Sequence, residues 1–182
     1  MTVGGERFVE LYESHYTNVY RYCRRRTTAD EVDDAVAETF LTAWRKIDEL
    51  PEGEGTLPWL YAVAYRVLGH QWRKVSRQER LRGKLAGLGF AGVTPPEEYV
   101  VVNDESRQIL EALSGLRAKN RELLRLQTWE EMSSSEIASM FGISSAAVQK
   151  RLSRARKALA DEYDRLDRRR NKAPAAQKGG AW

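Results

Sequence analysis

The chain has 182 residues, of which 42% are hydrophobic, and it carries 30 Lys and Arg against 26 Asp and Glu. This length allows one domain or two small ones, and the apolar content is sufficient for a core. The only cysteine, Cys23, excludes an internal disulfide and a cysteine-rich zinc site. No apolar run reaches the roughly 18 residues of a membrane span, and no signal peptide opens the chain. We therefore expect a cytoplasmic protein without membrane insertion.

Charge is distributed unevenly along the chain. Residues 1–80 contain 12 Lys and Arg against 13 Asp and Glu, whereas residues 106–182 contain 16 against 9. An excess of positive charge is what a phosphate-binding surface requires. The C-terminal half is therefore the stronger candidate for nucleic-acid binding, and the N-terminal half has to be interpreted one helix face at a time.

Almost every segment shows the helical spacing of apolar residues, so the sequence predicts an all-α fold. The first helix is expected over about residues 6–26, with Arg24–Arg26 at its end, where cations suit the helix dipole. The second is expected to begin at a capping box of Thr28 and Glu31 and to continue to Ile47.

The second predicted helix has two contrasting faces. Its buried face includes Phe40 and Trp44, whereas the opposite face carries Asp33, Asp34 and Glu38. Phosphate would repel such an acidic face. It is therefore either a solvated surface or a docking surface for a basic protein partner.

A loop over residues 48–58 precedes a third predicted helix, which Thr56 can cap. One face of this helix mixes aromatic and cationic side chains, with Tyr61, Tyr65 and Trp72 at its margins. The face consists of Trp59, Arg66, His70, Arg73, Lys74 and Arg77. Unpaired bases can stack on such aromatics while the cations neutralise phosphates. For Tyr61 and Trp72, a place in the core is an equal alternative.

Glycine and proline break the helical pattern after the third helix. Residues 81–103 are therefore predicted to be an acidic linker, and helices resume near Asp104. The last segment, 164–182, is predicted to be a disordered basic tail, in which Arg168–Arg170 would add sequence-independent affinity for DNA.

Residues 133–159 have the pattern of a helix-turn-helix. Ser133 and Glu136 have the spacing of a capping box, so a helix is expected to begin there. Gly142 can adopt the left-handed conformation that ends this helix, and Ser144 can cap the next one. In such a motif the second helix enters the DNA major groove.

The second helix of this motif is predicted to have one apolar side and one basic side. The apolar stripe is Val148, Leu152, Ala155 and Leu159. The other side and its flanks carry Ser145, Ala146, Gln149, Lys150, Arg151, Arg154, Arg156 and Lys157. Gln149 can pair with a base edge, and the cations can contact phosphates. The alternative is a solvated basic face of an ordinary bundle helix, but the caps, the glycine turn and the absence of acids favour DNA binding.

Two of these stretches resemble bacterial sigma factors. The run Asp33–Arg45 resembles their second-region signature, and Glu136–Leu159 resembles their fourth region. The matched segments cover roughly residues 6–80 and 104–163, and the gap between them is too short for another domain. The resemblance therefore implies the extracytoplasmic-function class, with two small helical domains joined by a flexible linker.

The resemblance also implies a role for each surface. The acidic face would dock on core RNA polymerase, at the β′ clamp helices and the β subunit, through Asp33, Asp34, Glu38, Leu41 and Arg45. The loop 48–56 and the third helix would recognise and melt the −10 promoter element through Trp59, Tyr65, Arg66, His70, Arg73, Lys74 and Arg77. The 145–157 helix would read the −35 element, and the linker would thread into the RNA path of the polymerase. Such proteins are often held inactive by an anti-sigma factor.

The chain departs from the family pattern at three places. Ala37 replaces the usual Gln, the pair Tyr65-Arg66 replaces Arg-Asn, and Ala146-Ala147 replaces a small residue followed by threonine. The last two changes bear on which promoter is read. Because Ala147 has no hydroxyl, selectivity at the −35 element is expected to rest more on Gln149, Lys150 and Arg151.

Two other classes of function were weighed against this one. A stand-alone helix-turn-helix regulator would explain residues 104–163, but it would not explain the acidic face or the third helix. An enzyme acting on nucleic acid would need a phosphate-binding loop or metal ligands, whereas His15 and His70 are isolated in the sequence. We therefore expect no catalytic residue, no metal site and no cofactor.

Overall fold

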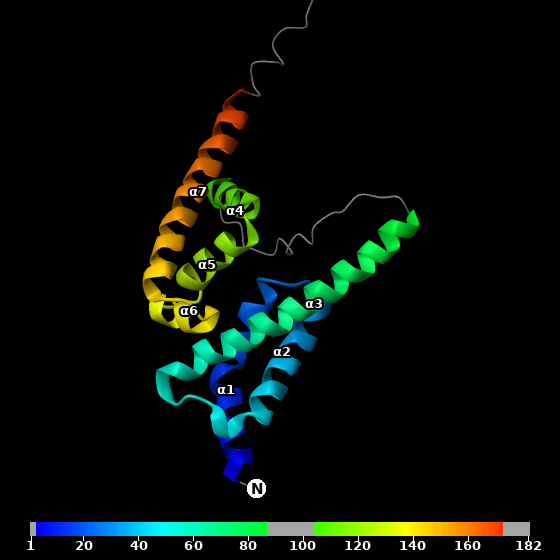
Figure 1. The fold of residues 1–182 in the computed structure, drawn as a ribbon, viewed down its shortest axis with the longest axis vertical. Helices are drawn as coiled ribbons and strands as arrows, with labels where there is room; N and C mark the ends of the chain where they lie inside the picture. Colours follow the sequence, from blue (N-terminus) through cyan, green and yellow to red (C-terminus); the bar gives the residue numbers. More distant parts are fainter. Residues whose placement is uncertain (1–2, 87–103, 173–182) are drawn as a thin grey trace, which may run out of the picture. The chain divides into compact units, whose positions relative to one another are not determined.

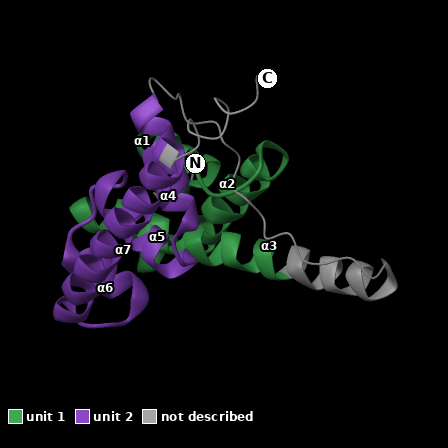
Figure 2. Cartoon of the chain, turned by 90° about the horizontal axis from the view of Figure 1, so that it is seen from above, with its two compact units in different colours: residues 1–98 green, residues 99–182 purple. Residues whose placement is uncertain are grey.

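The computed structural model describes the backbone of residues 3–86 and 104–172, and the side chains of residues 4–73 and 104–171 (Figure 1). The chain divides into two compact units, residues 1–98 and 99–182 (Figure 2). Every regular element in the described ranges is a helix, which confirms the predicted all-α fold. None of these helices is both long and apolar enough to cross a lipid bilayer.

In the described part of the first unit, residues 3–86, three helices pack against one another. They are α1 (Val3–Arg24), α2 (Ala29–Arg45) and α3 (Thr56–Ala86), with the short 3₁₀ turns Ile47–Glu49 and Gly53–Gly55 between α2 and α3. Its buried core draws on all three helices and includes Val19, Tyr22, Val36, Phe40, Leu60 and Leu68. Burying each such side chain stabilises the fold by about 1.5–3 kcal/mol before the cost of ordering it.

The turn between α1 and α2 is built around a buried arginine, which the sequence did not suggest. Arg26 is only 1% exposed; its Nη1 donates to the Tyr22 carbonyl at 3.0 Å, and its guanidinium lies 3.6 Å from the Tyr22 ring centroid. Tyr22 in turn stacks on Tyr61 at 4.9 Å, so Tyr61 belongs to the core. The first helix was predicted to end at Arg26 but ends at Arg24, and Arg26 packs in the core against the Tyr22 ring.

Two predicted helix starts are stabilised differently from the expectation. Thr28 makes no side-chain capping bond; its neighbour Thr27 instead donates to Glu31 at 2.5 Å. Thr56 is the first residue of α3, and its hydroxyl donates back to the Pro51 carbonyl at 2.8 Å, which ties the preceding loop to the helix. In both places the hydroxyl stabilises the preceding turn and does not accept a hydrogen bond from the unpaired N–H groups at the start of the helix.

Helix boundaries and burial also differ from the sequence-based expectation in the first unit. Helix α2 ends at Arg45, two residues before the predicted end at Ile47, and Trp44 is 43% exposed rather than buried. Helix α3 continues through Gly83 to Ala86, so the predicted linker does not begin at residue 81. The remaining linker, 87–103, lies outside the described residues.

The second unit contains four helices, three of which pack on the fourth. They are α4 (Asp104–Gly115), α5 (Ala118–Thr128), α6 (Ser134–Phe141) and α7 (Ser145–Lys172). Helices α4, α5 and α6 all lie along α7 (Figure 1). The core includes Leu113, Leu126, Ile137, Val148 and Leu152. In α4 the polar Gln108 is buried, whereas the apolar Ile109 is 43% exposed.

Helix α7 extends well beyond its predicted end, and its extension packs on α4. Residues 164–172 are helical, so the prediction of a disordered tail from 164 was wrong there; residues 173–182 lie outside the described residues. Leu166 is buried, and Arg170 Nη1 donates to Gln108 Oε1 at 3.0 Å. Glu162 lies close to Gly115, where an added Cβ would approach Glu162 Oε1 to 2.6 Å.

Replacing Leu166 with Ala tests whether this extension stabilises the second unit. We expect a loss of about 2–3 kcal/mol, because a buried leucine is replaced by a cavity. The exposed Arg169→Ala is the matched control and should change stability by less than about 0.5 kcal/mol. Hydrogen exchange of α4 and α7 amides in the full chain measures both variants. Equal exchange in the two variants would mean that the extension is not part of the folded unit.

Candidate functional site

The helix-turn-helix forms with the local geometry that the sequence predicts. The Glu136 amide donates to Ser133 Oγ at 3.2 Å, and the Ser133 amide donates to Glu136 Oε2 at 2.7 Å, which completes the capping box. Gly142 ends α6 in the left-handed conformation, with a φ of 64°. The Ile143 amide then donates to the Ala138 carbonyl at 3.0 Å, as in a Schellman-type cap.

A hydrogen-bonded cap and buried side chains fix the start of α7. Ser144 Oγ accepts a hydrogen bond from the Ala147 amide at 3.2 Å, which confirms the predicted cap. Val148, Leu152 and Ala155 are almost fully buried, and they hold α7 against the other helices of the unit. This arrangement fixes the rotation of α7 about its own axis, and therefore which residues face outward.

The residues predicted to contact the −35 element all lie at the surface of α7. Every one of them is exposed: Ser145, Ala146, Gln149, Lys150, Arg151, Arg154 and Lys157. Within the described part of the chain, none of these four cations makes an ion pair or a side-chain hydrogen bond. Arg156 differs from them, because its Nη2 donates to Gln127 Oε1 at 2.6 Å and so helps to join α7 to α5. The fold thus leaves four cations available for an external anion.

The predicted −10 face lies on α3 and is only partly described. Trp59 is half-buried, and Arg66, His70 and Arg73 are exposed. Tyr65 and Trp72 are half-buried, which places each between the two alternatives of core and surface. The side chains of Lys74 and Arg77 lie outside the described residues, although the helix itself continues past both positions. Side chains four or seven residues apart share a helix face, so Trp59, Arg66, His70 and Arg73 can act together.

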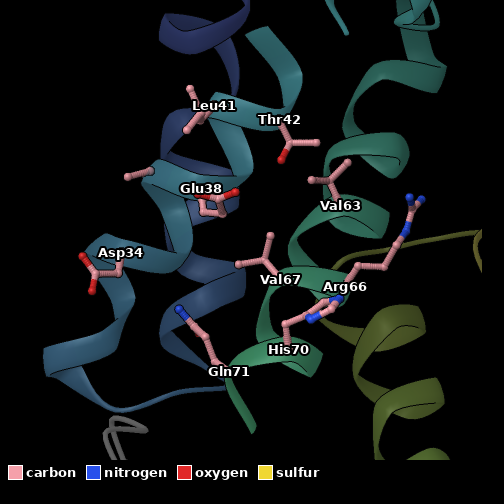
Figure 3. A pocket seen from close by; sticks show the side chains of 10 residues that line it. Asp34, Glu38, Leu41, Thr42, Val63, Arg66, Val67, His70 and Gln71 are labelled. Carbon is pink, nitrogen blue, oxygen red and sulfur yellow. The ribbon is translucent and has the colours of Figure 1, made fainter. Parts of the chain in front are cut away.

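An open groove with a volume of about 1000 Å³ separates the acidic face of α2 from α3. Asp34, Glu38 and Leu41 line it from α2, and Arg66 and His70 line it from α3 (Figure 3). In Figure 3 Val67 and Gln71 point toward α2, while Arg66 extends away from it. Among the described residues, no ion pair joins the acids of one wall to the cations of the other.

The acidic face itself is barely neutralised by the chain. Arg45 Nη1 approaches Glu38 Oε1 to 3.9 Å, but both side chains are more than half exposed. Such a pair contributes about 0–1 kcal/mol. Asp33 and Asp34 are exposed and have no ion-pair partner in the described ranges. Gln71 Oε1 is buried beside this face and accepts no hydrogen bond, a feature that sequence spacing gave no means to detect.

The loop between α2 and α3 is held against α1. Arg7 Nη2 lies 3.5 Å from Glu52 Oε1, and a hollow of about 370 Å³ between α1 and the loop is lined by Ser14 and His15 among others. Burial lowers the pKa of His15, so this imidazole is neutral near pH 7. The sequence gave no sign of the contact, because Arg7 and Glu52 are far apart along the chain. In the described residues, no group of three or more His, Cys, Asp or Glu is placed to hold a metal ion.

Comparisons with known proteins identify both units. Residues 11–78 match the model of sigma-70 region 2, and residues 106–159 match that of sigma-70 region 4. The chain belongs to the sigma-70 family of RNA polymerase sigma factors. It is an alternative sigma factor, which directs promoter-specific initiation of transcription, and nothing in the comparisons supports a stand-alone regulator.

Individual relatives agree with this assignment. The sigma factor NccH of Alcaligenes xylosoxydans xylosoxydans is 30% identical over 136 residues, which cover 71% of each chain. The probable sigma factor RfaY of Xanthomonas campestris pv. campestris is 34% identical over 86% of this chain, but the match spans only 39% of RfaY. The extracytoplasmic-function sigma factor SigL of Mycobacterium tuberculosis is 29% identical over 153 residues. These relatives support the extracytoplasmic-function class.

Solved structures show the same fold. The sigma factor RpoE of Bartonella quintana, in complex with the anti-sigma factor NepR, has a TM-score of 0.67 at 22% identity, covering 86% of this chain and 96% of that one. CnrH, in complex with the cytosolic domain of CnrY, has a TM-score of 0.59 at 23% identity, covering 86% and 87%.

The turn of the helix-turn-helix can be tested through Gly142. In Gly142→Ala a side chain must adopt the left-handed conformation, which costs about 1–2 kcal/mol. We expect a loss of this size in urea unfolding of the second unit, together with weaker binding of a −35 duplex. Ser139→Ala, an exposed change in the same helix, is the control. If both variants behave like the unchanged chain, the left-handed turn does not position α7.

Proposed function

We propose that this sigma factor uses three separate surfaces, each for one partner. The acidic face of α2, made of Asp33, Asp34, Glu38, Leu41 and Arg45, docks on the β′ clamp helices of core RNA polymerase. The α3 face binds the melted −10 element, and the outward face of α7 binds the −35 element. The observation that supports the proposal is that Asp34 and Glu38 on α2 form no ion pair with the exposed cations of α3 or α7 among the described residues. The protein performs no catalytic step and acts where the polymerase is, in the cytoplasm.

The acidic face suits a protein partner and excludes DNA. Asp33, Asp34 and Glu38 would repel phosphates, but they would attract the Lys and Arg side chains of a basic protein surface. Leu41 is 42% exposed on the same helix, which gives the face an apolar contact as well as charge. A mixed surface of this kind is typical of a specific protein interface.

The α3 face suits single-stranded DNA. Melting a promoter requires unstacking, at roughly a few kcal/mol per disrupted step. Stacking a released base on an aromatic side chain stabilises the melted state by about 1–3 kcal/mol. Trp59, which is half-buried on this face, is the aromatic residue that we propose for this stacking. Arg66 and Arg73 would neutralise phosphates of the same strand. The loop 48–56, which Thr56 ties to Pro51, would contribute to the capture of flipped-out bases.

The α7 face suits duplex DNA. The small side chains of Ser145 and Ala146 let the start of the helix approach the floor of the major groove. Gln149 would pair with a base edge, and the exposed cations would contact phosphates on either side. Since Ala147 cannot supply a hydroxyl, the choice of base depends more on Gln149, Lys150 and Arg151.

The two DNA-binding units would act together once polymerase holds both. Each contact alone is weak, but joining two sites on one chain raises their combined affinity by mass action. We also propose control by an anti-sigma factor, because the structural relative RpoE was solved in complex with the anti-sigma factor NepR. The predicted domains, residues 6–80 and 104–163, extend along the described helices to residue 86 in the first unit and to residue 172 in the second.

Reversing the charge of the α2 face tests the docking proposal. Asp34→Lys combined with Glu38→Lys should reduce the affinity for core polymerase at least tenfold, because basic side chains of the partner would then be repelled. Binding of a −35 duplex should not change. The affinity is measured by fluorescence anisotropy of labelled sigma factor titrated with core enzyme.

A matched variant controls for net charge. Asp161→Lys with Asp164→Lys makes the same change of charge on exposed positions of α7 and should leave polymerase affinity within twofold. Equal losses in the two double variants would show a general charge effect, and an unchanged affinity for the α2 variant would refute the docking proposal.

Substitutions on α7 separate base reading from phosphate binding. Gln149→Ala should lower the preference for a −35 duplex over a scrambled duplex, whereas Lys157→Ala should weaken both alike. The Lys157 variant should also lower the slope of log K against log salt by about 1. Duplex titrations at several salt concentrations measure both effects. If Gln149→Ala instead weakens both duplexes equally, Gln149 does not read a base.

A further inference from the structure

The loop between α2 and α3 is folded tightly onto itself. It contains the two short 3₁₀ turns Ile47–Glu49 and Gly53–Gly55. The hydroxyl of Thr56 donates to the Pro51 carbonyl at 2.8 Å. A Cβ added to Gly55 would come within 3.1 Å of Pro51 Cβ, so the chain passes close to itself at this point. The loop therefore has little room to change its own shape.

The same loop is anchored along α1. Leu50 is only 7% exposed, and Ile47 Cγ2 lies 4.0 Å from the position that a Cβ on Gly4 would occupy. Farther along α1, Leu11 and His15 line the hollow between this helix and the loop. The contacts thus extend over roughly three turns of α1. Helix α1 forms the support on which the loop lies.

One ion pair joins the tip of the loop to α1. Arg7 Nη2 lies 3.5 Å from Glu52 Oε1, and the two side chains are 39% and 89% exposed. Among the residues that line the hollow, only Arg7 is positively charged near pH 7, because burial lowers the pKa of His15 and keeps its imidazole neutral. An exposed ion pair shifts an equilibrium by at most about fivefold. This is too little to decide whether the unit folds, but it is enough to set the preferred position of a loop tip.

The position of the loop bears on where a base can be held. The turn Gly53–Gly55 leads directly into the first turn of α3 and contacts that helix. Trp59, the aromatic residue proposed to stack a released base, follows three residues after the start of α3. Stacking and hydrogen bonds must act on the same base, and such a site keeps its selectivity only when its parts are held to within about 0.5 Å. A displaced loop would therefore select bases less well.

We propose that α1 positions the loop for base recognition at the −10 element, and that Arg7 is a positioning residue for this step through its ion pair with Glu52. The loop is then pre-formed before DNA arrives, so a captured base does not have to order it. This inference rests on the proposed role of the loop in base capture and deepens it, because it names the residues outside the loop that set its selectivity.

A purely electrostatic role for Arg7 makes the opposite prediction. Glu52 would then repel the phosphates of the melted strand, and Arg7 would only cancel that charge. Removing the charge of Glu52 would strengthen binding to every sequence alike and leave the preference between bases unchanged. If Arg7 positions the loop, removing the charge of Glu52 releases the loop tip and lowers this preference.

The test measures base preference in the assembled holoenzyme. The full chain bound to core polymerase is incubated with a pool of single-stranded DNA of randomised sequence, and the bound fraction is sequenced. Arg7→Gln and Glu52→Gln should each lower the enrichment of the preferred base about threefold, because the loop tip is no longer held. Enrichment is a ratio between sequences, so a general change of charge cancels. The reversed pair, Arg7→Glu with Glu52→Arg, should recover most of the loss.

Two matched variants control for the change of charge. Glu10→Gln alters an exposed acid of α1 that lines the same hollow, and Arg21→Gln alters an exposed arginine of the same helix. Neither residue makes an ion pair with the loop in the described ranges, so both variants should leave the enrichment unchanged. Because Glu52 is 89% exposed, Glu52→Gln does not disturb the core and decides the test by itself if Arg7→Gln fails to fold.

The outcomes separate this inference from the function on which it rests. If the unchanged chain enriches no base, the proposed capture of bases at the −10 element fails. If it enriches a base and Glu52→Gln does so equally, base capture stands and positioning by α1 is refuted. A loss in both single variants that the reversed pair does not recover would mean that the two side chains act separately, which also overturns the proposal.

Discussion

The proposed function of this protein depends on charged groups that lie on the two walls of one groove and form no ion pair across it in the described residues. Across the groove of the first unit, Asp34 and Glu38 face Arg66 and His70 without forming an ion pair in the described residues. An internal pair would be worth about 0–1 kcal/mol at such exposed sites, so the fold loses little stability by its absence. An external protein or phosphate can then bind each set separately. The apolar contacts between α2 and α3 set the width of the groove. This width keeps the acids of α2 and the cations of α3 from pairing with each other.

The parts of the structure that could be predicted are those whose causes are local. The capping box of Ser133 and Glu136, the left-handed Gly142 and the cap at Ser144 all act within four residues of chain. Each therefore appears in the sequence as a short pattern. The outward face of α7 follows from the same information, because the burial of Val148 and Leu152 fixes the opposite side. For this reason the sequence alone could place the residues predicted to contact the −35 element on the exposed side of α7.

The sequence-based expectations failed where a residue contacts a partner far away in the sequence, or where two alternatives differ little in energy. Gln108 is buried, where it accepts a hydrogen bond from Arg170, 62 residues later, and the spacing of apolar residues did not indicate this contact. Glycine lowers helix stability by only about 1 kcal/mol, so Gly83 did not end α3 as expected. Trp44 lies beside the Phe8 ring rather than inside the core, because Phe40 already fills the space between α1 and α2. In none of these places can the interaction that decides the structure be deduced from the spacing of residues along the chain.

The length of α7 has a further consequence for how the second unit meets DNA. With a rise of about 1.5 Å per residue, Arg168 lies roughly 35 Å along the helix from Ser145. A major groove is about 12 Å wide, so side chains at the far end of α7 cannot enter the groove that the first turn occupies. The cluster Arg168–Arg170 was expected to add affinity for DNA, but Arg170 is engaged with the buried Gln108, and Arg168 donates to the Asp164 carbonyl. Arg170 therefore contributes to the packing of α7 on α4, whereas the hydrogen bond of Arg168 lies within α7. Since α4 is held by this extension, residues beyond the matched family region contribute to the rigidity with which α7 is presented.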